Sequence, residues 1–295
     1  MGLLFDQFAQ SHPSTRALIP FKYFVAAILL FVPLMAAQTT ADQKLSANDL
    51  VRRVIANELR MQDQDHSHWM YHLETVKAGV KETKIVAGTK DGSLALLIAR
   101  NDHPLTDDQL KQEEQRMNSF IHDQAEQQKQ KRAAQEDGAK TKQLLSMLPD
   151  AFVFSYEQGN GDSGETVTLD FKPNPGFHPS TREAHVFHEM EGKLTLNRKE
   201  DRLAEMNGRL MHDVKFGGGI LGHLDQGGTF DVRQDRVGAD YWEITRLKVN
   251  MKGKALFFKT IGVEQDETRS HFQQIPDTVT LAQAGDLLLK EVARH

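Results

Sequence analysis

Short runs in which every second residue is apolar recur along most of the chain. One run covers residues 152–156, and beyond a Gly-rich turn the next covers 167–171. This period of two places the apolar side chains of each run on one face of a β-strand. Further runs of this kind are separated by turn residues near Lys199, Gly238 and Gly253. We count about ten strands with hairpin-length links, which predicts an antiparallel sheet.

The first predicted strand, residues 66–76, carries different side chains on its two faces. Trp69 and Tyr71 share one face, whereas His68 and Met70 share the other. We expect the histidine-bearing face to be exposed to solvent. Two more runs follow, with a turn at Asp91-Gly92 between them, and they complete a predicted three-stranded meander.

Two shorter segments have helical periodicity and flank the predicted sheet. Ser46 can cap a helix, with Asp49 three residues later and an apolar stripe that includes Leu50 and Val54. A C-terminal helix is predicted over residues 280–294, because Leu281, Ala284, Leu287, Leu288 and Val292 form a stripe to be buried.

A long polar insertion, residues 106–148, interrupts the strands. Thr106 and Gln109 form a capping box, and an apolar stripe follows for about four turns. Residues 122–143 are then almost all Gln, Glu, Lys, Arg and Ala, a composition typical of a solvated helix or a mobile lid. Leucines and a methionine at 144–148 predict a docking patch, and Pro149 is expected to end the helix.

The N-terminal residues 1–37 predict an export signal. Arg16 and Lys22 precede an apolar run at 23–37 that is 15 residues long. A membrane-spanning helix needs about 20 residues, so we expect a signal peptide, with an uncleaved anchor to the inner membrane as the alternative. The remaining chain, 45–295, is then one exported domain, and a chain without cysteine suits a bacterial periplasm.

The composition excludes several kinds of chemistry. With no cysteine, the chain has no disulfide, no thiolate nucleophile and no cysteine zinc site. A net charge of −5 gives no general attraction to nucleic acid, so no nucleic-acid partner is expected. No G-x-S-x-G motif indicates a hydrolase nucleophile.

The stretch 213–230 contains a G-x-G-x-x-G spacing at Gly217, Gly219 and Gly222. In dinucleotide-binding loops this spacing lies between a strand and a helix, whose N-terminus meets the pyrophosphate. Here another predicted strand follows within a few residues, and we expect no cofactor. The glycines are therefore predicted to form a bend between two antiparallel strands, with Ile220 and Leu221 at its tip.

Histidines are the remaining candidates for chemistry. His66 and His68 lie on the first predicted strand, and His185 and His188 lie in the sequence His-Val-Phe-His-Glu. The latter spacing differs from the His-Glu-x-x-His order of metalloproteases. A surface role is the favoured interpretation, and a metal-dependent enzyme of the cell envelope stays open as the third hypothesis.

The second half of the chain resembles the LolA/LolB-like periplasmic lipoprotein-carrier family, whose fold is also used by the RseB sensor. The resemblance lies in a Gly-x-Leu-x-Leu strand and its returning strand at 190–210, and in the Gly-led and Trp-containing strands at 227–258. It extends over about residues 45–275. The polar insertion departs from the family. The chain is also similar to uncharacterised exported bacterial proteins.

The resemblance implies a mainly β fold with helices, in which an open, incomplete antiparallel barrel is covered by helices on its apolar face. It also implies a monomeric, non-enzymatic protein that binds a lipid or a lipoprotein acyl chain and needs no cofactor. The residues that we expect to line the ligand cavity are Trp69, Tyr71, Phe154, Leu169, Trp242, Ile220 and Leu221. The alternative is a protein-interaction or envelope-stress sensor module that recruits a partner through 106–148.

Overall fold

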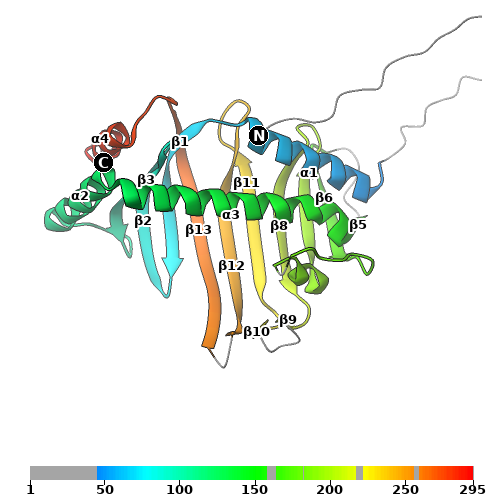
Figure 1. The fold of residues 1–295 in the computed structure, drawn as a ribbon. Helices are drawn as coiled ribbons and strands as arrows, with labels where there is room; N and C mark the ends of the chain where they lie inside the picture. The colour runs from blue at the N-terminus through cyan, green and yellow to red at the C-terminus, as the bar shows by residue number, and fades with distance from the viewer. Residues whose placement is uncertain (1–44, 158–163, 182, 217–221, 256–258, 295) are drawn as a thin grey trace, which may run out of the picture. The chain divides into compact units, whose positions relative to one another are not determined.

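The strands pair into one open antiparallel sheet in this computed structural model (Figure 1), which describes residues 45–157, 164–181, 183–216, 222–255 and 259–294. Within these ranges the sheet has thirteen strands, of which eleven follow the order β4-β3-β2-β1-β13-β12-β11-β8-β7-β6-β5, and β10, off this path, pairs with both β12 and β9. Three of the strands have only two or three residues, which leaves the ten longer ones that the sequence predicts. The sheet does not close into a barrel.

The strands are β1 (His68–Lys77), β2 (Val80–Thr89), β3 (Gly92–Arg100), β4 (His103–Pro104), β5 (Phe152–Tyr156), β6 (Thr166–Pro173), β7 (Met190–Asn197), β8 (Arg202–Leu210), β9 (Val214–Phe216), β10 (Gly222–Leu224), β11 (Thr229–Arg236), β12 (Trp242–Ala255) and β13 (Lys259–Ile275). The helices are α1 (Ala47–Gln64), α2 (Asp107–His122), α3 (Gln124–Ala151) and α4 (Leu281–Val292), with a short 3₁₀ helix η1 (Glu183–Glu189).

The strand register shows which residues lie on the same face of the sheet, because residues directly opposite on paired strands point to the same side. One such row consists of Leu169, Leu194, Met206, Val232, Leu247, Glu267 and Thr75. We call the side of this row the α1 face. Met70 has the opposite parity to Thr75 on β1, so it lies on the other side, which we call the α4 face.

The α1 face is buried at the β5–β8 end of the sheet. Ser46 caps α1 by accepting the N–H of Asp49, as the sequence predicts. The stripe of α1 that includes Val51 and Val54 is fully buried against side chains such as Phe152 and Phe171. Leu148 and Ala151 of α3 close the same core.

A second core lies on the α4 face at the other end of the sheet. Met70 and Ile85 of the meander are buried there with Met117 of α2 and Leu288 of α4. The expectation that the face of His68 and Met70 is exposed to solvent is therefore wrong, since α2 and α4 cover it. The sequence pattern showed the two faces correctly but could not show that helices cover opposite faces at opposite ends.

The insertion predicted at 106–148 forms two helices that connect these cores. The capping box of Thr106 and Gln109 is present at α2, and Asp123 separates the helices by capping α3. Pro149 does not end α3 as expected; it lies buried in the last helical turn, and the helix continues to Ala151. Figure 1 shows α3 crossing in front of the sheet from the β3 end to the β5 end.

Polar side chains and helices protect both edges of the sheet. At β5 the side-chain amide of Asn48 donates to the carbonyl of Phe152 and accepts the N–H of Phe154. At β3 the guanidinium of Arg116 on α2 donates to the carbonyl of Ala95. These contacts satisfy edge groups that could otherwise pair with another chain.

Lys44–His295 form one compact unit. Of the helices in the described part of the chain, none has the length and apolar character needed to span a bilayer.

We expect Gly192→Ala to destabilise the protein. A Cβ at Gly192 would lie 2.0 Å from the carbonyl oxygen of Asn207 on β8, so the backbone would have to move. Such overpacking typically costs about 1–3 kcal/mol of unfolding free energy. The matched control is Gly138→Ala on α3, where a Cβ meets nothing within 4 Å. Alanine should stabilise that helix by up to about 1 kcal/mol. Urea unfolding of both variants measures the contrast, and equal stability would contradict this account.

Candidate functional site

The middle of the α1 face lies between the two cores and is crossed by α3. The side chains of residues 131–140 of α3 are all exposed, so this part of the helix buries no side chain in either core; Lys131 at its start donates to the carbonyl of Lys90. Both ends of α3 are held. Leu148 is buried in the α1-face core, and near the N-terminus Gln127 donates to the carbonyls of Phe120 and Ile121. The centre of α3 thus spans the sheet without covering it (Figure 1).

Apolar side chains occupy the middle of the α1 face. Trp69, Val86 and Leu97 are buried but belong to neither of the two cores. Leu73 and Leu247 are half-buried in the same region. This group is therefore a third apolar region of the sheet, in which Leu73 and Leu247 are the half-buried members.

Four aromatic rings form a cluster at one end of this region. Trp69 meets Tyr241 and Phe272 edge to face, with ring centroids 5.5 and 6.2 Å apart. Tyr71 stacks on Phe272 at 5.3 Å. The indole N–H of Trp69 donates to the hydroxyl of Ser67 at 2.8 Å, so this buried ring has its polar partner.

Charged groups border the aromatic cluster. The guanidinium of Arg269 lies 5.6 Å from the centre of the Tyr71 ring and bonds to Glu267. Burial raises the pKa of Tyr71, and Arg269 opposes this shift only in part. The phenol is therefore neutral at physiological pH and can act as a hydrogen-bond donor.

An open trough of about 900 Å³ extends the α1 face toward the β1–β2 turn. Its lining is charged and includes Glu82, which binds both Lys84 and Arg100. These two cations hold the pKa of Glu82 below its usual value. The α1 face thus changes from aromatic to aliphatic to charged along its length.

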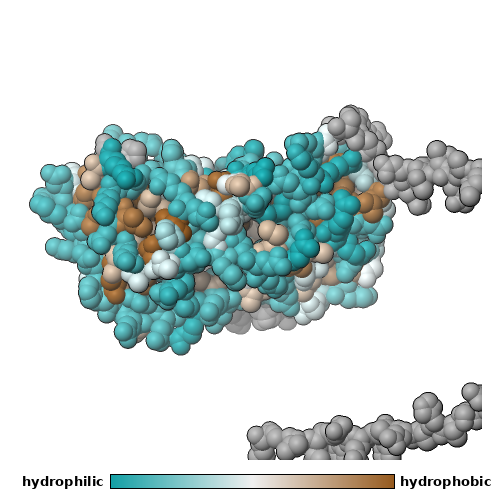
Figure 2. Space-filling model, turned by 90° about the horizontal axis from the view of Figure 1, so that it is seen from above, coloured by the Kyte–Doolittle hydropathy of each residue, from teal (hydrophilic) through white to brown (hydrophobic). Residues whose placement is uncertain are grey.

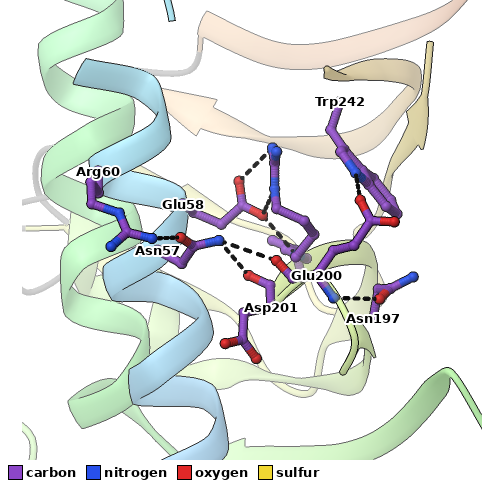
Figure 3. Close-up of polar contacts among 9 residues, drawn as sticks. Asn57, Glu58, Arg60, Asn197, Glu200, Asp201 and Trp242 are labelled. Atoms are coloured by element: carbon purple, nitrogen blue, oxygen red, sulfur yellow. Dashed lines mark hydrogen bonds and ion pairs between the residues drawn. The ribbon is translucent and has the colours of Figure 1, made fainter. Parts of the chain in front are cut away.

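Trp242 lies in a smaller cavity of about 290 Å³ beside the C-terminal end of α1. Its indole N–H donates to the carboxylate of Glu200 at 2.8 Å (Figure 3). The guanidinium of Arg202 lies 5.5 Å from its ring centre. Arg202 is held by the carboxylate of Glu58 at 2.8 and 3.2 Å, and Glu58 also accepts the N–H of Leu203 at 2.7 Å.

The pair Glu58–Arg202 is almost completely buried and fixes α1 to the start of β8. The side chains are 3% and 8% exposed. Nearby, the side chain of Asn57 donates to the carbonyls of Glu200 and Asp201 (Figure 3). The β7–β8 turn is therefore attached to α1 by side chains that sequence reasoning did not single out, because their partners are 144 residues apart.

The expected cavity residues divide into three groups. Trp69, Tyr71 and Trp242 lie on the α1 face outside the main core. Phe154 and Leu169 are buried in the core beneath α1, which occupies the space that a ligand there would need. Ile220 and Leu221 lie outside the described residues. Sequence reasoning missed Leu73 and Phe272, although Leu73 shares the two-residue period of Trp69 and Tyr71 and could have been included.

The strands on either side of the Gly-rich stretch pair antiparallel, which agrees with the predicted bend between them. Gly222 of β10 pairs with Phe216 of β9, and β11 follows β10 without a helix between them. The helix N-terminus that a pyrophosphate site requires is therefore not at this position of the described chain.

The histidines proposed for metal binding lie on different elements. The rings of His185 and His188 on η1 have centroids 6.4 Å apart, whereas His68 lies on β1. Within the part of the chain that the structure describes, no three His, Asp or Glu side chains are grouped as a metal site would require.

Seen from above, most of the surface is hydrophilic, and hydrophobic side chains gather at the end that carries α2 and α4 (Figure 2).

Comparison with protein-family models, curated proteins and solved structures gives no match. The resemblance to lipoprotein carriers therefore stays a prediction from the sequence, and the site has to be interpreted from its own geometry.

We expect Glu58→Gln to destabilise the protein strongly. The substitution leaves the guanidinium of Arg202 buried without its counter-charge, which typically costs about 3–5 kcal/mol. The double variant Glu58→Met/Arg202→Met should be more stable than the single variant, because it leaves no unpaired charge. Glu165→Gln is the matched control, since its pair with Lys199 is exposed and should change stability by less than about 1 kcal/mol. Chemical denaturation measures the free energy of unfolding of each variant. If Glu58→Gln were as stable as Glu165→Gln, the anchoring role of the buried pair would be contradicted.

Glu243 gives a pH-dependent prediction. Burial, and next the negative charge of Asp65, raise the pKa of Glu243 above its ordinary value of 4.5. An acid with a raised folded-state pKa favours the fold when protonated, so its contribution is full below the unfolded pKa and is lost as pH rises through the folded pKa. Glu243→Gln should therefore raise Tm at pH 7, and the difference from wild type should disappear below the ordinary pKa of 4.5. Thermal unfolding across pH tests this; a gap that widens in acid would contradict it.

Proposed function

We propose that the protein is a non-enzymatic binding protein that holds an apolar or amphipathic ligand, such as a lipid acyl chain, on the middle of the α1 face. The observation that carries the proposal is the central part of α3, which crosses this face with all its side chains from 131 to 140 exposed. A helix segment that packs on neither core leaves the apolar residues opposite it accessible to a ligand.

The chemistry of the face fits an acyl chain. Leu73 and Leu247 are half-buried rather than sealed, and the aromatic cluster around Trp69 adds apolar area beside them. Burial of a chain on such a surface is favourable by about 0.8 kcal/mol per methylene. A ligand could therefore be held without any catalytic group.

The charged trough suits the polar end of such a ligand. Lys84 lies directly opposite Leu73 on the α1 face, and Arg100 lies on the same face of β3, opposite Glu82. The aromatic cluster would hold the apolar end and the trough the head group. With the export signal predicted at 1–37, the proposed setting is the bacterial periplasm.

A partner-binding role for α3 is the second candidate, favoured by the same exposed segment. Removing residues 106–148 cannot separate the two functions, because Met117 and Leu148 belong to the two cores. The surface variant Arg132→Glu/Lys140→Glu changes α3 without touching either core. Ligand binding should persist in this variant, whereas a partner that recognises α3 should be lost in a pull-down from envelope extract.

Leu73→Asp should weaken fatty-acid binding while the fold is retained. Arg269 and Lys84 lie directly opposite Leu73 on the neighbouring strands and can compensate the new carboxylate. Placing a charge against an acyl chain should weaken binding at least about tenfold. Titration with a fluorescent fatty acid measures the change.

Val153→Asp is the matched control for this experiment. Val153 lies on β5 with the opposite parity to the core residues Phe152 and Phe154, and it is 51% exposed. The control should bind as wild type does. If neither wild type nor control takes up fatty acid, or if both variants lose binding equally, the proposed site is wrong.

A further inference from the structure

Three cations accompany one carboxylate on the α1 side of the open trough. Glu82 binds both Lys84 and Arg100, at 2.9 and 3.0 Å. Lys77 lies two residues from Thr75 on β1, so it points to the same face. Among the described residues, no carboxylate lies within 4.0 Å of the ammonium group of Lys77. We call Lys77, Lys84 and Arg100 the trough cations.

The other acids that border the trough do not balance this charge. Glu267 binds Arg269 at 3.3 Å, and this pair is neutral by itself. Glu264 and Asp266 have the opposite parity to Glu267, so they point toward the α4 face, where Asp266 binds Lys248 at 2.9 Å. With three cations and one carboxylate, the α1 side of the trough therefore has two positive charges in excess.

The excess charge directly adjoins the third apolar region. Lys84 lies opposite Leu73 on one side and opposite the buried Leu97 on the other. Leu247 lies opposite Glu267, which lines the trough. Side chains directly opposite on paired strands have Cβ atoms about 4.5–5.5 Å apart. One small amphiphile can therefore contact the leucines and the trough cations at the same time.

Arg100 has hydrogen-bond donors to offer such a ligand. Its Nη2 donates to Glu82, whereas its Nε and Nη1 meet no acceptor within the part of the chain that the structure describes. The planar guanidinium matches the geometry of a carboxylate or a phosphate. Hydrogen bonds between ionised groups are also stronger than those between neutral groups.

We propose that the ligand of the α1 face is an amphiphile with an anionic head group, a carboxylate or a phosphate, which binds at the trough cations while its chain lies along Leu73 and Leu247. This proposal rests on the function proposed above and adds the charge class of the ligand. A free inorganic anion would meet the cations but leave the leucines in water. A choline head group would bring a further cation to a site that already has an excess of them.

The test titrates the full chain with probes that share one alkyl chain: dodecanoate, dodecyl phosphate, dodecanol and dodecylphosphocholine, each below its micelle concentration. The readout is the Kd of dodecanol divided by the Kd of each anionic probe. We expect the anionic probes to bind about tenfold more tightly than dodecanol at low salt, and added salt should reduce this ratio. The tighter of the two anionic probes identifies the head group.

Lys77→Gln/Lys84→Gln removes the two excess charges, because Arg100 and Glu82 then balance each other. The ratio should fall to near one in this variant, while the Kd of dodecanol stays within about twofold of wild type. Lys172→Gln/Lys199→Gln is the matched control, since it removes the same charge from exposed positions at the β5–β8 end of the sheet. The control should keep the wild-type ratio. The apolar run 23–37 is the same in every variant, so it does not affect the comparison.

The outcomes separate this proposal from the function on which it rests. If no probe binds, the function proposed above fails and the head-group assignment fails with it. If dodecanol or dodecylphosphocholine binds wild type as tightly as the anionic probes do, only the head-group assignment is overturned. It is also overturned if the control lowers the ratio as much as Lys77→Gln/Lys84→Gln does, or if inorganic phosphate alone binds as tightly as dodecyl phosphate.

Discussion

The two apolar cores lie on opposite faces of a single sheet, and this constraint determines the path of the rest of the chain. Register fixes which side each residue occupies, so Met70 and Leu194 cannot be buried by the same layer of helices. The segment that joins β4 to β5 has to reach both sides. It does so with α2, whose Met117 is buried in one core, and α3, whose Leu148 is buried in the other.

The polar composition of α3 follows from this role. A helix that begins near one core and ends in another has no surface to bury along its centre, so a continuous apolar stripe there would be exposed to water. The same geometry leaves the middle of the α1 face with apolar residues that belong to neither core. The candidate ligand site is thus a consequence of how the helices divide between the two faces.

Buried polar contacts hold α1 on its face of the sheet. Glu58 and Arg202 attach α1 to β8 from within the structure, and Trp242 and Glu200 extend the network toward the adjoining cavity. On the α4 face, exposed ion pairs such as Lys248–Asp266 and Arg246–Asp231 join side chains of neighbouring strands.

The sequence by itself determined the local elements. A period of two predicted the ten longer strands, and the capping residues at Ser46 and Thr106 predicted where α1 and α2 begin. These features depend on neighbouring residues only, so they are visible in the chain. The alternation also separated Trp69 and Tyr71 from His68 and Met70.

Only the tertiary structure decided which face each helix covers. Periodicity shows that a strand has an apolar face but not what packs against it, so the burial of Met70 and the position of Phe154 and Leu169 beneath α1 could not be inferred. The pairing of Glu58 with Arg202 and the alignment of Arg269 with Lys84 join residues far apart in the chain. Such contacts depend on register and strand order, which no local pattern specifies.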